Sequence, residues 1–201
     1  ILNIGGIANL TLVNGNSDQD ILSKDIGPGN CLLDNWIQAY TNKKIDNDGK
    51  ISKSGTVNEI ILEQALETYE NNSQKKVFRS YDTKDFDISF ARGLSVEDGA
   101  ATLLSYTAKI IASGISSILK GFNNNNINIY LCGGGRKNLN LINNIKLNSN
   151  KNLFFYDIDT LGLKGDFIES QAFAYLAVRS ILSLPLSFPK TTGCKIPSSG
   201  G

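Results

Sequence analysis

The chain opens with short apolar stretches in which apolar and polar positions alternate. A period of two is typical of β-strands, so residues 1–13 are predicted to form two short strands interrupted by Gly5-Gly6. A further apolar stretch over 20–24 follows a turn-prone polar segment and predicts a third strand. The first part of the chain is therefore expected to be a meander of strands.

Farther along the chain, apolar residues recur every three or four positions, which is the spacing of an amphipathic helix. Asn30 is predicted to cap the first of these helices, and a capping box that starts at Ser95 is predicted to open the longest one, which ends near Gly121. The segment 41–56 is polar and contains glycine, so it is expected to be a loop. The predicted helices in this part of the chain cover residues 32–40, 57–69 and 95–121.

The last third of the chain alternates strands with helices. A compact apolar strand over 127–131 stops at a run of glycines, and a helix over 139–147 leads to another strand over 153–158. An apolar helix over 166–184 is expected to be the last regular element, with coil after it. A meander followed by this alternation predicts an α/β fold, a mixed sheet with flanking helices.

Charge and composition exclude several classes of function. The 201 residues carry 20 basic and 19 acidic side chains, a net charge of +1, so no electrostatic field favours nucleic acid or an anionic membrane as a partner. The basic residues are scattered and indicate a solvated face. The chain has no histidine, which excludes catalytic triads and metal sites that need one. Any acid–base chemistry therefore falls to carboxylates, lysine or tyrosine.

Cysteine usage bears on the compartment. Cys31, Cys132 and Cys194 are far apart and odd in number, so neither a zinc site nor a disulfide framework is indicated. No apolar run approaches the roughly 18 residues that span a bilayer, and no secretory signal is recognisable. We therefore expect a cytoplasmic protein. Because the chain begins at Ile1 and contains no methionine, we also expect residues upstream of it.

Asp25 is the first candidate for a catalytic group. It stands at the predicted end of a strand, directly before a glycine-rich turn and a helix start. Ligands bind at such strand ends in α/β sheets, and a helix N-terminus favours an anion nearby. A carboxylate there can accept a proton from an attacking hydroxyl or water. The alternative is an Asx-turn that only shapes the loop.

Two glycine motifs border the predicted strands. Gly5-Gly6 can let backbone N–H groups approach a phosphate, and the glycines at 133–135, with Asn138 after them, can cradle adenosine or phosphate. Each motif also has a structural explanation, a hairpin turn for the first and a tight strand-to-helix turn for the second. The local residues leave both explanations open.

Glu169 is a second candidate carboxylate, one turn into the predicted last helix. It can point into a cleft as a catalytic group. Alternatively, Glu169 and Asp166 form a reciprocal capping pair in which Asp166 is the N-cap. The local sequence allows either role.

Taken together and in order, longer strings in the chain resemble the anhydro-N-acetylmuramic acid kinase family. They are NIGGIANLT, DIGPGN, EDGAATL, CGGGRKN and IESQAFAYLAVR, and they extend over almost the whole chain. The resemblance implies a ribonuclease-H-like mixed sheet with flanking helices, as in the C-terminal lobe of an actin-like ATPase fold. It also implies ATP and Mg²⁺ as cofactors, a small sugar as substrate and a homodimer.

By this resemblance, the family converts 1,6-anhydro-N-acetylmuramic acid to N-acetylmuramic acid 6-phosphate in peptidoglycan recycling. Water opens the anhydro bridge while the released 6-oxygen takes the γ-phosphoryl group of ATP. Asp25 falls at the position of the general base, and Glu169 at that of a second carboxylate that faces the attacking water. The positions that match nucleotide-binding segments are Gly5, Gly6, Asn9, Gly27, Gly29, Asn30, Gly133, Gly134, Gly135 and Asn138.

The chain departs from the family pattern in places. Ile26 stands where threonine is usual, which removes a hydroxyl beside the base, and Val77-Phe78-Arg79 stands where Pro-Pro-Lys is usual. The family's N-terminal phosphate loop and most sugar contacts are absent, so residues 1–201 are expected to be the C-terminal nucleotide-binding lobe of a two-lobe sugar kinase, inactive alone. The alternatives are another sugar or acetate kinase of the same superfold, and a non-catalytic nucleotide-binding lobe.

Overall fold

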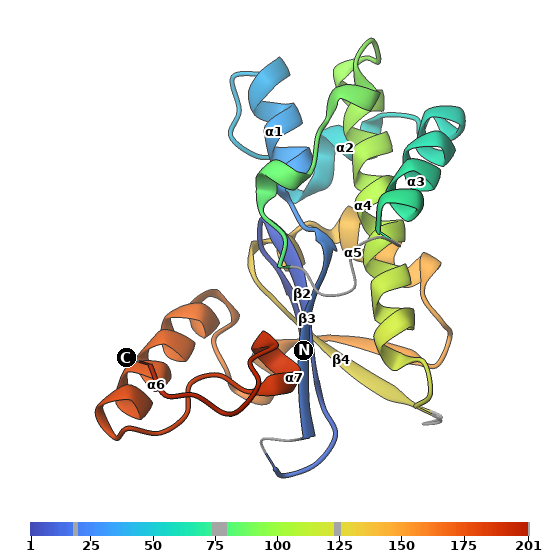
Figure 1. The fold of residues 1–201 in the computed structure, drawn as a ribbon. Helices are drawn as coiled ribbons and strands as arrows, with labels where there is room; N and C mark the ends of the chain where they lie inside the picture. Colours follow the sequence, from blue (N-terminus) through green and yellow to red (C-terminus); the bar gives the residue numbers. More distant parts are fainter. Residues whose placement is uncertain (18–19, 74–79, 123–125, 201) are drawn as a thin grey trace.

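A five-stranded mixed sheet organises the computed structural model of the chain (Figure 1). The strands are β1 (Leu2–Ile4), β2 (Ile7–Val13), β3 (Ile21–Pro28), β4 (Ile127–Cys132) and β5 (Leu153–Asp157). They are ordered β3-β2-β1-β4-β5, with the first three antiparallel and the β1–β4 and β4–β5 pairs parallel. The structure describes residues 1–17, 20–73, 80–122 and 126–200. The predicted α/β fold with a mixed sheet is confirmed.

Helices surround this sheet, and α4 is the central one. The α-helices are α1 (Cys31–Tyr40), α2 (Lys50–Ser54), α3 (Glu59–Ser73), α4 (Val96–Leu119), α5 (Leu139–Asn148), α6 (Ile168–Ile181) and α7 (Pro189–Thr192). The 3₁₀ segments are η2 (Asn47–Gly49), η3 (Thr83–Asp85), η4 (Ser89–Ala91), η5 (Gly134–Lys137), η6 (Ile158–Leu161) and η7 (Gly165–Phe167). Helix α4 packs against α1, α2, α3, α5 and β3, so it joins most of the helices to the sheet.

Helix α4 is apolar because most of its length lies in the core. The predicted N-cap is confirmed, since Ser95 Oγ accepts a hydrogen bond from Asp98 N at 3.0 Å. The indole of Trp36, fully buried on α1, donates to Val96 O at 2.9 Å and fixes the start of α4 against α1. By length and composition α4 could cross a membrane, but 61% of its apolar window is buried inside the fold, as in the core helix of a globular protein.

Two segments that were expected to be coil contain helices. Asp46 accepts hydrogen bonds from Ile51 N at 2.8 Å and Ser52 N at 3.0 Å, and so it stabilises the start of α2 within the predicted loop 41–56. Near the C-terminus, α7 begins at Pro189, a residue whose fixed φ suits the first helical position. The loop and coil predictions are therefore wrong at these two places.

The last long helix, α6, is shorter at both ends than predicted. Phe167 occupies its N-cap position, while Asp166 precedes it in η7. No residue of α6 is buried, although several of its large side chains are apolar. In Figure 1, α6 stands apart from α1 to α4, beside α7. The position of α6 therefore depends on the residues that lead into it and follow it.

Candidate functional site

Three glycine-bearing turns meet at one end of the sheet. The turn after β3 contacts the turn between β1 and β2, because Gly29 N donates to Gly6 O at 2.9 Å. The turn after β4 lies against the end of β1, because a Cβ added to Gly133 would come within 2.6 Å of the Ile4 carbonyl oxygen. The turns predicted to bind nucleotide are therefore neighbours, although they come from separate stretches of the chain.

Asn30 and Asn138 take different positions at these turns. Asn30 occupies the N-cap position of α1 without a side-chain cap, so that part of the prediction is wrong. Its side-chain nitrogen is instead the atom nearest to the Cβ position of Gly134, at 3.9 Å. Asn138 is buried and accepts a hydrogen bond from Leu141 N at 3.1 Å, which caps α5. Of the two amides, that of Asn30 faces the glycine turn.

Asp25 lies inside β3, opposite Asn9 of β2, and not at the strand's end. Its Oδ1 accepts a hydrogen bond from Asn9 Nδ2 at 3.0 Å, and its Oδ2 accepts from Ser80 Oγ and Tyr81 N, both at 2.9 Å. Asn9 is held in turn, since its Oδ1 accepts from Ser23 Oγ at 3.1 Å. Because a carboxylate oxygen has two lone pairs, Oδ1 keeps acceptor capacity for a ligand while the group's orientation is set by the protein.

Ser80 and Tyr81 are functional candidates that sequence reasoning missed. They lie 55 and 56 residues from Asp25 along the chain, and no periodicity relates them to it. Ser80 directly follows residues 77–79, where the sequence was expected to depart from the family pattern. The departure at residues 77–79, including Arg79, lies outside the described residues.

A β-bulge next to Asp25 decides where the side chain of Ile26 lies. The register of β2 against β3 shifts beside Asn9, and Ile26 is the extra residue. Ile26 is 7% exposed and packs on α4. A Cβ added to Gly114 of α4 would come within 2.6 Å of the Cβ of Ile26. Ile26, where the resemblance led us to expect threonine, therefore packs in the core, and not on the side of Asp25 that carries its hydrogen-bond donors.

A cavity of about 910 Å³ extends from Asp25 along β2 and β3 to α7. This volume is in the range of small-molecule sites. Residues 20–25 line the cavity, and the glycine turn at residues 27–30 follows directly in the sequence, so Asp25 belongs to the cavity wall two residues before the turn. The other lining residues are Asn9, Leu12, Asn14, Ser80, Tyr81, Phe122, Pro189, Lys190, Thr191, Thr192 and Gly193.

The residues at the turns suit a nucleotide phosphate with Mg²⁺. The Cβ position of Gly134 meets no atom closer than 3.9 Å, so the backbone at this one residue of the turn is open to a ligand. Proteins usually bind Mg²⁺ through one or two carboxylates together with substrate phosphates and water, and Asp25 supplies a carboxylate beside the turns. Within the described ranges, no group of three or more acidic or cysteine side chains could hold a metal ion alone.

Glu169 is exposed in the first turn of α6. In the described part of the chain, no hydrogen bond or ion pair joins it to Asp25. Asp166 does not cap α6 but bonds to Arg136 Nη1 at 2.7 Å and to Lys137 Nζ at 2.9 Å. The predicted capping pair of Asp166 and Glu169 is therefore wrong, because long-range basic partners take Asp166. The catalytic role of Glu169 stays a prediction.

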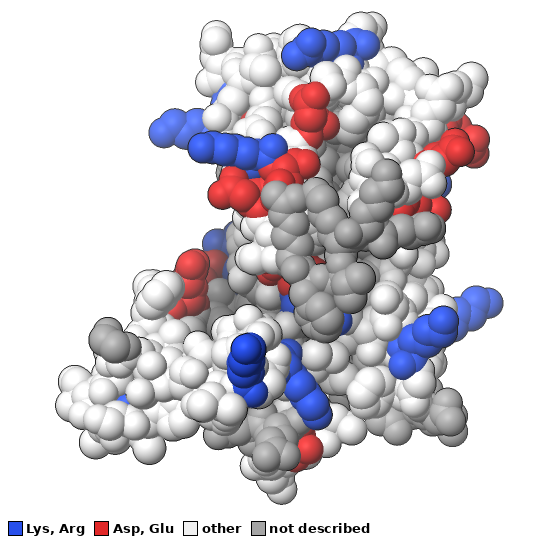
Figure 2. Space-filling model, in the orientation of Figure 1, with Lys and Arg blue, Asp and Glu red and all other residues white. Residues whose placement is uncertain are grey.

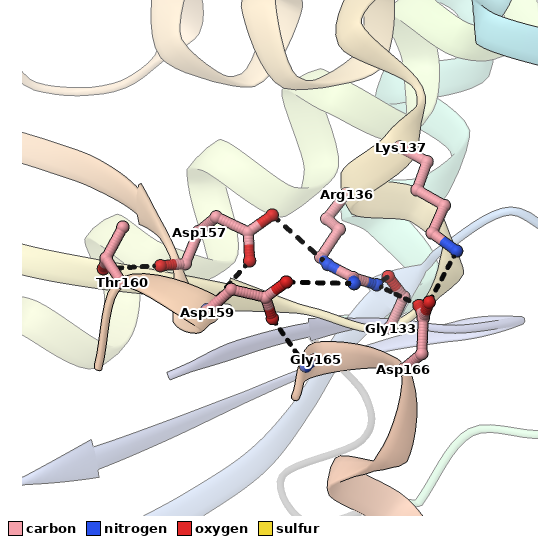
Figure 3. Close-up of polar contacts among 8 residues, drawn as sticks. All are labelled: Gly133, Arg136, Lys137, Asp157, Asp159, Thr160, Gly165 and Asp166. Atoms are coloured by element: carbon pink, nitrogen blue, oxygen red, sulfur yellow. Dashed lines mark hydrogen bonds and ion pairs between the residues drawn. The ribbon is translucent and has the colours of Figure 1, made fainter. Parts of the chain in front are cut away.

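Arg136, directly after the glycine turn, does not belong to a solvated face. Its side chain is only 6% exposed, and its guanidinium lies among Asp157, Asp159 and Asp166 (Figure 3). Hydrogen bonds from Lys137 and from Arg136 hold the pKa of the Asp166 carboxyl below its usual value. The prediction that the basic residues are solvated is therefore wrong for Arg136.

Charged side chains elsewhere are dispersed. On the face drawn in Figure 2, basic and acidic residues are interspersed, and neither sign forms one continuous patch. This distribution agrees with the net charge of +1.

The fold and the site define a class of protein. A mixed sheet of this kind with flanking helices, glycine turns that meet at one end and a carboxylate beside them are features of the actin-like ATPase superfamily. Within that superfamily, the chain belongs to the anhydro-N-acetylmuramic acid kinase family, because the model of that family matches residues 1–201.

Similar proteins carry the same family name. The anhydro-N-acetylmuramic acid kinase of Pelagibacter ubique is 50% identical over 201 residues, which are 100% of this chain and 53% of that protein. The proteins of the same name from Zymomonas mobilis and Caulobacter vibrioides are 37% and 36% identical, and the matches cover 53% and 51% of their lengths. The chain spans about half the length of the curated relatives it matches.

Proposed function

We propose that the full-length protein containing this chain is an ATP-dependent kinase that converts 1,6-anhydro-N-acetylmuramic acid to N-acetylmuramic acid 6-phosphate, in peptidoglycan recycling. One observation carries the proposal: Asp25, with both oxygens oriented by the protein, lines a cavity of about 910 Å³ and precedes by two residues the glycine turn that contacts the turn between β1 and β2. Family membership over the whole chain supports the same reaction.

Asp25 acts as the general base in this proposal. Phosphoryl transfer needs positioning, charge neutralisation and one base. Asn9, Ser80 and Tyr81 N orient the carboxylate, so that it accepts the proton of the water that opens the anhydro bridge. The released 6-oxygen then takes the γ-phosphoryl group. Glu169 acts as a second carboxylate that faces the same water.

The glycine turns hold the nucleotide. Gly5, Gly6 and Asn9 lie on the phosphate side, and the turn after β4, with Gly133, Gly134 and Gly135, lies on the adenosine side. Gly27, Gly29, Asn30 and Asn138 complete the set predicted from the sequence. Mg²⁺, when bound, neutralises charge on the phosphates. The cavity along β2 and β3 takes the sugar.

Residues 1–201 are the C-terminal, nucleotide-binding lobe of a two-lobe kinase in this proposal. The relatives are nearly twice as long as the matched region, which leaves room for a second lobe that supplies further sugar and phosphate contacts. The isolated chain is therefore expected to be inactive, while the whole protein acts in the cytoplasm as a homodimer.

An assay of ADP release tests the proposal. The full-length protein is incubated with MgATP and either the anhydro sugar or N-acetylmuramic acid, which lacks the anhydro bridge (the open sugar). Residues 1–201 alone are assayed in parallel. We expect ADP release with the anhydro sugar and formation of the 6-phosphate. Phosphorylation of the open sugar alone would indicate another sugar kinase. Nucleotide binding without turnover on either sugar would indicate a non-catalytic lobe, and full activity of residues 1–201 alone would contradict the two-lobe requirement.

A further inference from the structure

Arg136 is a buried side chain at the centre of a cluster of half-exposed aspartates that joins several segments (Figure 3). Its Nη1 donates to Gly133 O at 3.1 Å and to Asp166 Oδ1 at 2.7 Å. Its Nε lies 3.3 Å from Asp157 Oδ2, and its Nη2 lies 4.0 Å from Asp159 Oδ2. The guanidinium therefore connects the glycine turn after β4 with the end of β5 and with the two 3₁₀ segments that lead to α6.

The segment before α6 is built closely around this guanidinium. Gly165 is buried, and a Cβ added to it would come within 2.8 Å of Arg136 Cζ. Gly165 N also donates to Asp159 Oδ1 at 2.6 Å. A side chain at position 165 would require the guanidinium to shift, so the backbone just before α6 packs directly against Arg136.

The charge balance makes Arg136 essential to the cluster. Three aspartates face it, and the other nearby cation, Lys137, contacts Asp166 Oδ2 at 2.9 Å and is 61% exposed. A planar guanidinium bonds to several carboxylates at once, which an ammonium group does not do equally well. Without Arg136, the three carboxylates would repel one another around a poorly compensated site.

Glu169 lies three residues after Asp166, in the first turn of α6. Because no residue of α6 is buried, the helix does not fix its own start by packing. The contact between Arg136 and Asp166 thus fixes the start of α6 relative to the glycine turn at Gly133. It thereby also sets the position of Glu169.

We infer that Arg136 is a positioning residue, which ties the nucleotide-side glycine turn to the start of α6 and so holds Glu169 in place for catalysis. This inference rests on the proposed function and adds a residue to it. Arg136 acts through Glu169, and it does not touch the reacting atoms.

A double-mutant cycle in the full-length protein tests the inference. The variants are Arg136→Lys, Glu169→Gln and the two combined, with kcat and KM measured by ADP release from the anhydro sugar. Because misplacement of a catalytic group by about 1 Å can cost about 100-fold, we expect Arg136→Lys to lower kcat by about 10- to 100-fold. KM for ATP should change little. The combined variant should be no slower than Glu169→Gln alone, since residues that act as a unit are not additive.

Two further variants keep the test decisive. Arg92→Lys makes the same chemical change at an exposed arginine and should leave kcat within about twofold of the wild-type value. Asp166→Asn keeps Arg136 beside Asp157 and Asp159 but weakens the tie to α6. It should show the same non-additivity with Glu169→Gln, and it replaces Arg136→Lys if urea unfolding shows that variant to be misfolded.

The outcomes separate the inference from the proposed function. Additive losses in the cycle, or an unchanged kcat in Arg136→Lys, would overturn the positioning role and leave the kinase proposal intact. An unchanged kcat in Glu169→Gln would overturn it too, because no carboxylate would then need positioning. If the wild-type protein releases no ADP with the anhydro sugar, the proposed function fails, and the inference fails with it.

Discussion

The close approach of two glycine turns can be tested by adding one methyl group, with Gly29→Ala. A Cβ at position 29 would lie 2.3 Å from Gly5 O and 3.1 Å from the carbonyl carbons of Gly5 and Ile7. These are backbone atoms, so they cannot rotate away as a flexible side chain can. The turn after β3 must therefore separate from the turn between β1 and β2.

The cost of that separation follows from the bonds that it breaks. Gly29 N donates to Gly6 O at 2.9 Å, Asn30 N to Gly5 O at 2.8 Å and Cys31 N to Gly6 O at 3.2 Å. Since a typical hydrogen bond contributes about 1 kcal/mol net, we expect Gly29→Ala to lower the free energy of unfolding by about 2–3 kcal/mol.

Urea unfolding measures this loss. The single tryptophan, Trp36, is fully buried and reports unfolding by its fluorescence. Gly5→Ala is the matched control, because its Cβ would meet nothing closer than Ile7 O at 3.7 Å; we expect a change of less than about 0.5 kcal/mol there. Equal losses in the two variants, or no loss in Gly29→Ala, would refute the proposed contact between the turns.

Two other predictions concern titratable groups. Burial, and to a smaller extent the nearby Asp46, raises the pKa of Asp34 to about 6. Between about pH 4 and pH 6 the folded state therefore keeps a proton that the unfolded chain has lost. The free energy of unfolding should accordingly fall as the pH rises through this range. Asp34→Asn should remove this fall, which we expect to be about 1 kcal/mol after allowance for partial exposure; an unchanged pH profile of urea midpoints would contradict the assignment. Burial raises the pKa of Cys31 to about 11 and also raises that of Cys132, whereas Cys194 is half-exposed. A disulfide-exchange reagent at pH 8 should therefore label Cys194 first and the other two only in urea, and equally fast labelling of all three would show that the burial is wrong.

The sequence predicted the elements whose signals are local. Alternating positions on either side of Gly5-Gly6 predicted β1 and β2, and the apolar stripe after Ser95 predicted α4. Helix α2 was missed because its start depends on Asp46, which lies outside the helix and bonds to Ile51 N and Ser52 N. A polar stretch with one glycine gives no periodic signal for such a helix.

The candidate site shows the same division between local and distant contacts. Asp25 and the glycine turns could be predicted, since each is marked by a strand followed by glycine. Ser80, which donates to Asp25, could not, because the two are 55 residues apart and the contact exists only after folding. Asp166 was assigned to a local cap, but Arg136, 30 residues earlier, offers a stronger charged partner.

The assignment of Asp25 as general base is the central claim, and one substitution in the full-length protein tests it. Asp25→Asn keeps the size of the side chain and removes its ability to take a proton. We predict that kcat for the anhydro sugar falls by about 10²- to 10⁴-fold, the usual contribution of a general base, while the dissociation constant for MgATP stays nearly unchanged. A variant that binds MgATP normally and keeps a kcat close to the wild-type value would contradict the claim.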